Sequence, residues 1–229
     1  VGLRQLVERV LGDTSIERLR LSSLQPQEIS ADLLALWQDK RLCRHLHLAL
    51  QSGSDTVLQR MRRRYSLDDY QEAMNLVNEA IPGVAITTDI MVGFPGESGE
   101  EFEQSYSFCQ QAGFANIHVF PFSPRPGTEA AGMPNQVRDG VRKERTYKML
   151  ELAQSCRHSF CERFLGQTMW VLWEKETNLG SGIYSGLTDN YIRVFAQSRK
   201  PLTNKIVLVK LVGFYDQGMW GELISENSS

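Results

Sequence analysis

The chain has 229 residues, and its 25 Lys and Arg against 27 Asp and Glu give a formal net charge of −2. This length is sufficient for one large or two modest domains with apolar cores. The nearly balanced charge excludes a globally basic nucleic-acid-binding protein, so any RNA contact must use local patches. No apolar run approaches the length of a membrane-spanning helix and no signal peptide is visible, which predicts a soluble, cytoplasmic protein without membrane contacts.

The first residues already follow a helical pattern, because apolar side chains recur at positions 3, 6, 7, 10 and 11 without a preceding N-cap. We therefore expect the sequence to be the carboxyl-terminal portion of a longer protein. Its four cysteines are too few and too scattered for a disulfide framework, which is typical of a reducing compartment. Cys156 and Cys161 are five positions apart on one predicted helix and do not share a face, so core packing is expected and no metal ligands are assigned.

Four segments have the pattern of β-strands, and helical patterns separate them: residues 18–24, 45–50, 85–92 and 116–122. Repeated βα units predict parallel strands in chain order with right-handed crossovers. In the second segment Leu46, Leu48 and Leu50 share one face, which should lie under helices, while His47 and Gln51 should face a cavity. Four units do not close a barrel, so either the sheet is open or further strands lie upstream.

Residues 86–97, ITTDIMVGFPGE, combine a buried strand with a glycine turn that leads into a helix. Such a turn places backbone N–H groups at the carboxyl end of the strand, where α/β proteins hold ligands. Asp89 strengthens this interpretation, because a carboxylate within an apolar strand is costly to bury without a partner. One face of the strand should therefore be core and the other polar. The alternative is an ordinary βα turn whose glycines serve only close packing.

A long helix is expected from about residue 141 to residue 164, ended by Gly166. Short β-type runs follow at 169–173, 191–195, 206–212 and 219–224. They predict a small all-β barrel of the OB-like kind. Six basic and six acidic residues in 166–229 balance each other, so composition alone does not indicate RNA binding by this barrel.

Several stretches resemble the radical S-adenosylmethionine (SAM) methylthiotransferases: RLSSLQP (20–26), HLHLALQSGSDTVLQRMRRRY (45–65), ITTDIMVGFPGE (86–97) and HVFPFSPRPGT (118–128). The β-type region with GLTDNY (186–191) resembles the TRAM domain of these enzymes. RMRRRY (60–65) and GLTDNY are most similar to the branch that acts on N6-threonylcarbamoyladenosine beside the tRNA anticodon.

The resemblance implies an α/β fold in which residues 1–160 form the last four βα units of a partial (β/α) radical SAM barrel and residues 163–229 form a TRAM domain. It implies methylthiolation at C2 of N6-threonylcarbamoyladenosine at tRNA position 37, with SAM, [4Fe-4S] clusters and an electron donor such as a flavodoxin or ferredoxin, by a monomer. The family's cluster-binding CxxxCxxC motif is absent from these 229 residues. The activity is therefore expected of the full-length protein and not of this segment alone.

The resemblance also implies SAM contacts at Gln51, Ser52, Asp89, Gly93 and Phe94. RNA contacts are expected at Arg62, Arg63, Arg64, Arg125, Arg193 and Lys205. The alternative for the arginines at 60–64 is a solvated helix end. For the whole chain, the alternatives are a non-catalytic RNA-binding remnant and a different radical SAM or aldolase-like (β/α) enzyme.

Two histidines at spacing i, i+2, His45 and His47, could in principle share a metal ion. No third ligand stands at a matching position. We therefore expect these side chains to line a polar cavity, and we interpret His118 on the fourth strand segment in the same way. No catalytic residue is assigned from the sequence.

Overall fold

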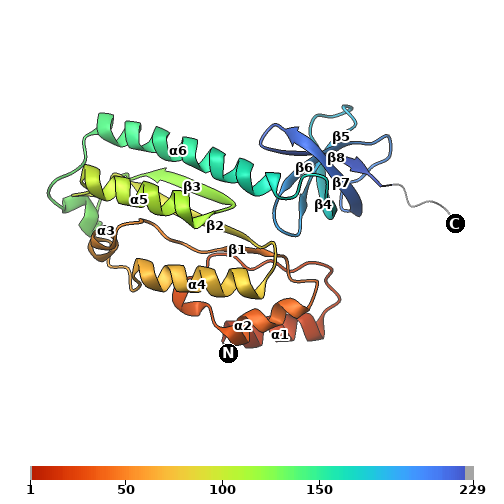
Figure 1. Ribbon diagram of the computed structural model, residues 1–229, viewed down its shortest axis with the longest axis horizontal. Coiled ribbons are helices and arrows are strands. Elements are labelled where there is room, and N and C mark those ends of the chain that lie inside the picture. Colours follow the sequence, from red (N-terminus) through yellow and green to blue (C-terminus); the bar gives the residue numbers. More distant parts are fainter. Residues whose placement is uncertain (1, 225–229) are drawn as a thin grey trace.

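The computed structural model describes residues 2–224. A three-stranded parallel sheet covered by helices lies at one end of the elongated molecule, and a closed five-stranded barrel lies at the other end (Figure 1). The long helix α6 (Asp139–Glu162) joins them. The expected order of an α/β part followed by a small all-β barrel is therefore present.

The other helices are α1 (Leu3–Asp13), η1 (Pro26–Glu28), α2 (Ala31–Leu34), η2 (Ala35–Gln38), α3 (Asp55–Arg60), α4 (Leu67–Ala80), α5 (Gly99–Ala112) and η3 (Glu129–Gly132). The strands of the sheet are β1 (His45–His47), β2 (Ala85–Val92) and β3 (Asn116–Pro121). Those of the barrel are β4 (Thr168–Glu176), β5 (Ile183–Thr188), β6 (Arg193–Gln197), β7 (Ile206–Tyr215) and β8 (Gly218–Leu223). Among the described helices, none combines the length and apolar character needed to cross a membrane.

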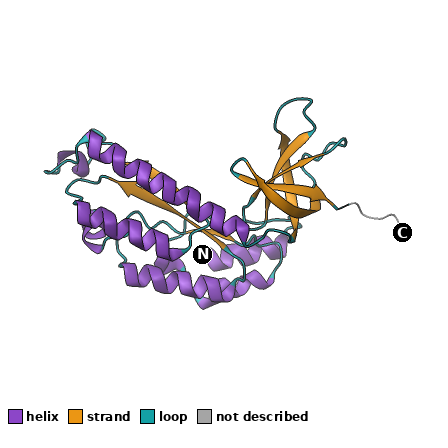
Figure 2. Cartoon of the chain, turned by 45° about the horizontal axis from the view of Figure 1, so that its top comes forward, coloured by secondary structure: helices purple, strands orange, loops and turns teal. Residues whose placement is uncertain are grey.

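The sheet has the order β1-β2-β3, and both pairings are parallel, as the repeated βα pattern predicts. Helices gather over one face of this sheet (Figure 2). On that face Leu46, Leu48 and Leu50 are completely buried, which confirms their predicted position under helices. Tyr70 on α4 is buried with them, and its hydroxyl donates a hydrogen bond of 2.8 Å to the Leu48 carbonyl oxygen.

Residues 18–24 do not form a regular strand, so the prediction of four strands is wrong. Leu19 and Leu24 make isolated parallel bridges to Leu42 and Leu48. Ser23 interrupts the segment, because its φ of 63° lies in the left-handed region rather than in the extended one. The Leu24 amide still donates to the His47 carbonyl oxygen at 2.9 Å. The segment therefore runs beside β1, in the predicted place, without completing a ladder.

The small barrel closes in the order β4-β5-β6-β8-β7, with β7 pairing back to β4. Its strand β5 is missing from the sequence prediction, and Tyr191 lies before β6 rather than inside it. Glycine and serine give β5 a low intrinsic strand preference, so its structure depends on pairing with β4 and β6. Gly186 allows this pairing, because a Cβ there would lie 2.5 Å from the Leu172 carbonyl oxygen.

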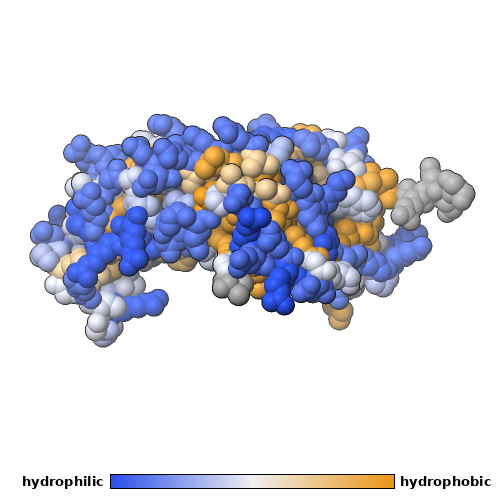
Figure 3. Space-filling view, turned by 90° about the horizontal axis from the view of Figure 1, so that it is seen from below, coloured by the Kyte–Doolittle hydropathy of each residue, from blue (hydrophilic) through white to orange (hydrophobic). Residues whose placement is uncertain are grey.

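Helix α6 contributes to both cores. Met149 and Leu152 pack into the core of the sheet, whereas Phe160 and Cys161 pack into the core of the barrel. Apolar side chains such as Leu6 and Trp170 remain more than half exposed, and Figure 3 shows a further apolar area at the middle of the face seen from below. Part of the apolar surface is thus uncovered in the described residues, which is a feature of proteins with further contacts.

Candidate functional site at the carboxyl edge of the sheet

The sheet face opposite the covering helices carries polar side chains. His47 on β1, Asp89 on β2 and His118 on β3 lie on this face, because successive residues of a strand point to opposite sides. In the strand register Asp89 is opposite His118, and the ring centroids of His47 and His118 are 5.8 Å apart. Ile90, next to Asp89, belongs to the buried core. The predicted division of β2 into an apolar and a polar face is confirmed.

Short contacts connect four polar side chains of this face. His47 Nε2 is 3.3 Å from Asp89 Oδ2. The Thr87 hydroxyl lies 3.0 Å from His47 Nδ1 and 3.1 Å from His45 Nε2. The hydroxyl has one proton, so it can donate to only one of these two rings. Thr87 thus links His45 to His47, and His47 lies beside the Asp89 carboxylate.

The His45 side chain is neutral at neutral pH. Burial lowers the pKa of His45 to about 3, and the positive charge of Arg20 and the neighbouring imidazoles act in the same direction. Burial also lowers the pKa of His118, although the Asp89 carboxylate partly opposes that effect. His45 and His118 are therefore neutral hydrogen-bonding groups at neutral pH.

Gln51 and Asp89 form the accessible part of the predicted SAM site. The Gln51 amide donates to the Asp89 carbonyl oxygen at 2.8 Å, and the Gln51 carbonyl accepts from the Met91 amide at 2.9 Å. These bonds continue the β1–β2 pairing to the carboxyl edge, although Gln51 has a left-handed φ of 70°. The Asp89 side chain is 29% exposed. Two of the five predicted residues thus meet at one half-open edge.

The other three predicted SAM residues are enclosed by protein. The Ser52 hydroxyl is buried and lies 3.1 Å from the Ser105 hydroxyl. Phe94 packs edge-on against Phe122, with ring centroids 5.5 Å apart. Gly93 has a φ of 76°, and a Cβ at this position would lie 2.9 Å from Cγ of Arg142. These three buried residues support the carboxyl edge of the sheet.

A buried ion pair that the sequence analysis did not identify fixes the glycine turn. Glu97 is almost completely buried and accepts hydrogen bonds of 2.8 Å from both the Gly93 amide and Nη1 of Arg145. Burial raises the pKa of Glu97 above its usual range, and the two donors oppose this shift. Glu97 ends the motif ITTDIMVGFPGE, so the signal was present, but its partner on α6 is distant in the sequence.

The predicted RNA contacts separate into two groups. Arg62, Arg63 and Arg64 follow α3 and are exposed at the carboxyl edge, and Arg62 pairs with Glu129 of η3. Arg125 is exposed in the loop after β3. The remaining two residues belong to the barrel: Arg193 on β6, which pairs with Glu174, and Lys205, which is exposed before β7. Helix α6 separates the two groups (Figure 1).

The segment 188–191, part of GLTDNY, holds the barrel against the amino edge of the sheet. The Asp189 carboxylate accepts hydrogen bonds of 2.6 and 3.0 Å from the Arg44 guanidinium. The Tyr191 ring stacks on His45 with a centroid distance of 4.4 Å, and the guanidinium of Arg20 lies 4.5 Å from the centre of the same ring. In the sequence this motif is only a family signature, whereas in the structure its side chains connect the barrel to the sheet.

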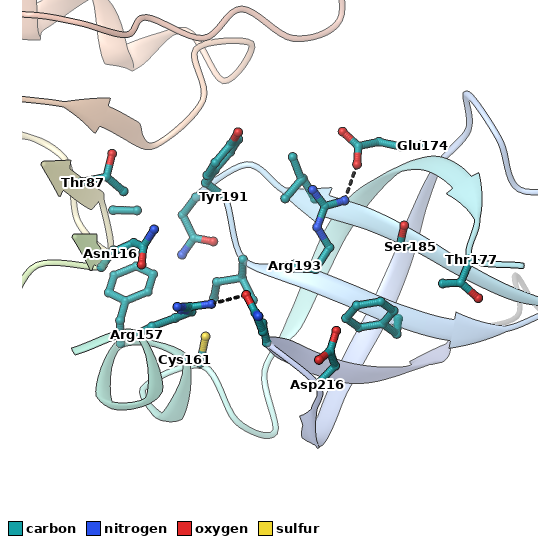
Figure 4. A pocket seen from close by; sticks show the side chains of 18 of the residues that line it. Thr87, Asn116, Arg157, Cys161, Glu174, Thr177, Ser185, Tyr191, Arg193 and Asp216 are labelled. Carbon is teal, nitrogen blue, oxygen red and sulfur yellow. Dashed lines mark hydrogen bonds and ion pairs between the residues drawn. The ribbon is translucent and has the colours of Figure 1, made fainter. Parts of the chain in front are cut away.

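A cavity of about 610 Å³ lies beside this junction (Figure 4). Thr87 and Asn116 of the sheet and Arg157 of α6 face the barrel residues Arg193 and Asp216 across it. Arg157 donates to the Gln217 side chain at 2.8 Å, and Arg193 is paired with Glu174. Because Asn116 begins β3, this cavity lies at the amino edge, opposite the end at which the sequence predicts ligands.

The cysteines do not fit a [4Fe-4S] cluster, which is held by several thiolates close together. Cys43, Cys109 and Cys161 are buried, and burial raises the pKa of Cys161 to about 11 and also raises that of Cys109. Neutral, separated thiols of this kind are packing residues. In the part of the chain that the structure describes, no group of three or more His, Cys, Asp or Glu is arranged to hold a metal ion.

Comparison with known proteins identifies the α/β part. Residues 5–109 match the sequence profile of the Radical SAM superfamily. This part of the chain is therefore similar to radical SAM proteins. The chain is 35% identical, over 98% of its length, to the threonylcarbamoyladenosine tRNA methylthiotransferase MtaB of Bacillus subtilis, of which it covers 50%. It is also 35% identical, over 90% of its length, to the tRNA-2-methylthio-N(6)-dimethylallyladenosine synthase of Acetivibrio thermocellus, of which it covers 43%.

The chain thus spans about half the length of the curated relatives that it matches. Its resemblance to the methylthiotransferases is confirmed by these identities. Among solved structures, the radical SAM enzyme coproporphyrinogen III oxidase of Escherichia coli aligns with 69% of the chain at a TM-score of 0.50 and 14% identity, and 36% of that enzyme is covered. This likeness concerns the fold alone, and it supports a partial radical SAM core.

Proposed function

We propose that this chain acts as part of a tRNA methylthiotransferase, with residues 1–160 as its radical SAM core and residues 163–229 as a TRAM domain. The observation that carries the proposal is the 35% identity to the Bacillus subtilis methylthiotransferase over 98% of the chain. The half-open carboxyl edge at Gln51 and Asp89 supports it, because α/β enzymes bind ligands at this end of their strands. The full-length protein would act in the cytoplasm as a monomer.

The proposed substrate is N6-threonylcarbamoyladenosine at tRNA position 37, which receives a methylthio group at C2. The name of the Bacillus subtilis relative supports this choice, as do the stretches RMRRRY and GLTDNY. The dimethylallyladenosine relative from Acetivibrio thermocellus has the same identity of 35%. Overall sequence identity therefore does not discriminate between the two substrates. The proposed substrate depends on the short stretches RMRRRY and GLTDNY.

When bound, SAM supplies the radical that attack on an unactivated C–H bond requires. We propose that Gln51 and Asp89 contact SAM, and that Ser52, Gly93 and Phe94 keep that edge in shape. His47, whose Nε2 lies 3.3 Å from Asp89 Oδ2, helps to position that carboxylate. We assign the [4Fe-4S] clusters, and the flavodoxin or ferredoxin that reduces them, to the full-length protein, because the cysteines of this chain do not fit a cluster.

We propose that the chain binds the tRNA anticodon stem-loop through Arg62, Arg63, Arg64, Arg125, Arg193 and Lys205. Phosphate contacts release counterions, so the logarithm of the binding constant should fall linearly with the logarithm of salt concentration. Replacing Arg62, Arg63 and Arg64 together by alanine should weaken binding and flatten that slope by about 0.7 to 0.9 for each phosphate that is no longer neutralised. The fold should be little affected, since the three side chains are exposed.

Fluorescence anisotropy with a labelled stem-loop across a salt titration measures both effects. The double variant Arg4→Ala, Arg9→Ala is the control, because these exposed arginines of α1 form ion pairs away from the carboxyl edge. We expect the control to bind as the unchanged chain does. An absence of affinity at low salt would contradict RNA binding, and an unchanged slope in the triple variant would remove the three arginines from the RNA site.

A second candidate is RNA binding without catalysis. It is favoured by one observation: these 229 residues contain no CxxxCxxC motif, and three of their four cysteines are buried. Both candidates predict affinity for the stem-loop, but only the first predicts methylthiolated nucleosides that depend on the gene.

A further inference from the structure

Three loops at the carboxyl edge of the sheet enclose a small cavity of about 220 Å³. They are the end of α3 after β1, the turn between β2 and α5, and η3 after β3. Apolar side chains form its floor: Met61, Met91, Phe94, Ala130 and Met133. Charged side chains form its rim: Arg60, Arg62, Arg63 and Glu129. Consecutive βα units therefore build one pocket, which is how barrel enzymes assemble a ligand site.

The size and position of the cavity suit a substituent of a larger ligand. Its volume is below the roughly 300–1,000 Å³ of pockets that enclose drug-sized ligands, so a whole nucleoside does not fit. Met91 lies two residues after Asp89 and on the same face of β2. The cavity therefore adjoins the proposed SAM site. Its methionines can adjust to the shape of an inserted group.

The charges of the rim are not balanced. Arg60 is paired with Glu101 at 2.7 Å, and Arg62 is paired with Glu129. Within residues 2–224, no carboxylate lies within 4 Å of the Arg63 guanidinium. The guanidinium of Arg63 is thus available to a ligand, whereas that of Arg62 is paired with the exposed carboxylate of Glu129.

The backbone holds these arginines in an unusual conformation. Arg62 has a φ of 56°, a region that residues other than glycine rarely adopt. Its amide donates to the Gln59 carbonyl oxygen, and the Arg63 amide donates to the Leu58 carbonyl oxygen, both at 2.9 Å. These two bonds form the left-handed cap that commonly ends a helix, here α3. This turn presents Arg62 and Arg63 at the rim while Met61 lines the floor.

The two groups of relatives differ in a way that such a rim can detect. A threonylcarbamoyl group carries a carboxylate and a hydroxyl, whereas a dimethylallyl group carries only apolar atoms. A guanidinium binds a carboxylate through two parallel hydrogen bonds but gains nothing from an alkene. We propose that this cavity receives the N6 substituent of the target adenosine, and that Arg63, assisted by Arg62, selects a substituent with a carboxylate. This inference rests on the proposed function.

Glu129 opposes the same selection. Its carboxylate occupies Arg62 and repels an incoming carboxylate at close range. Removing its charge by Glu129→Gln should release Arg62 and strengthen binding of a carboxylate-bearing substituent. The rim therefore predicts opposite effects for two neighbouring substitutions, which a general loss of structure cannot imitate.

The test uses the 229-residue chain and three synthetic anticodon stem-loops that differ only in the adenosine, which is threonylcarbamoylated, dimethylallylated or unmodified. Fluorescence anisotropy gives a Kd for each. We expect the threonylcarbamoylated loop to bind roughly tenfold more tightly than the other two, the effect of one charge-assisted hydrogen bond. Arg63→Ala should abolish this preference, Arg63→Lys should retain part of it, and Glu129→Gln should increase it. Arg64→Ala is the matched control, because Arg64 does not line the cavity. It should weaken all three loops equally.

Equal binding of the three loops would overturn the pocket assignment while leaving RNA binding intact. A preference that survives Arg63→Ala, or that Arg64→Ala removes as well, would overturn it too. If none of the loops binds at low salt, the proposed function fails and the pocket assignment fails with it.

Discussion

At the scale of single residues, the polar face of the sheet is organised by side chains that the sequence pattern could place only in part. Alternation along the strands was sufficient to predict that His47 and Asp89 share a polar face. The same alternation could not show that His45 is buried, because its cover is Tyr191, which comes from the barrel. Contacts between distant segments decide the protonation of this histidine, and local patterns do not report them.

His45 should make the stability of the chain depend on pH. Its pKa in the folded chain is about 3, below the usual value of 6.5, so between these values the unfolded chain binds a proton that the folded chain does not. The contribution of His45 is therefore complete above about pH 6.5 and is lost as the pH falls toward 3. His45→Gln keeps a donor for Thr87 but does not titrate in this range.

Thermal unfolding between pH 7 and pH 4 tests this expectation. The melting temperature of the unchanged chain should fall more steeply with decreasing pH than that of His45→Gln, and His158→Gln on α6 serves as a control that should follow the unchanged chain. Parallel curves for all three proteins would show that His45 has no such role.

At the scale of elements, strong periodicity and turn signals were predictive and weak strands were not. The prediction of 85–92 as a strand agrees with β2, since β-branched residues fill it and glycines end it. The prediction for 18–24 failed at Ser23, because an alternation of apolar and polar side chains does not reveal its left-handed backbone. Strand β5 was missed because Ser185 and Gly186 weaken its strand pattern, and pairing with the neighbouring strands determines its structure. The same limit applies to the candidate site. Glu97 belongs to a motif that can be recognised in the sequence, whereas no local pattern identifies Arg145 as its partner.

The loop between β5 and β6 should be a stabilising contact between barrel and sheet. Asp189→Asn leaves the Arg44 guanidinium without its carboxylate partner at a junction where both side chains are about one-third exposed. The expected loss of unfolding free energy lies between the ~0–1 kcal/mol of exposed pairs and the roughly 3–5 kcal/mol of buried ones, at about 1–2 kcal/mol. Denaturant unfolding measures it.

The exposed pair Arg9–Asp13 on α1 offers a matched control, since its side chains are 76% and 68% exposed. Asp13→Asn should change the free energy of unfolding by less than about 1 kcal/mol. An Asp189→Asn protein as stable as this control would mean that the loop does not hold the barrel in place.

At the scale of the whole molecule, the proposed function requires two surfaces of the chain to bind one extended ligand. Arginines at the carboxyl edge of the sheet and basic residues on the barrel lie at separate ends of α6 (Figure 1). A stem-loop that reached both would be held by phosphate contacts at each end, while its modified adenosine entered the carboxyl edge. The junction at Asp189 and Tyr191 fixes the spacing of the two surfaces, so both ends contribute to one binding site in this account.

The central claim is that the full-length protein methylthiolates N6-threonylcarbamoyladenosine in tRNA. Liquid chromatography with mass spectrometry of nucleosides from total tRNA tests it, in the source organism with the gene inactivated and again with the gene restored. Inactivation should remove the methylthio derivative of N6-threonylcarbamoyladenosine and leave its precursor to accumulate, and the restored gene should reverse both changes. Persistence of that derivative, or loss of the dimethylallyl derivative in its place, would contradict the account.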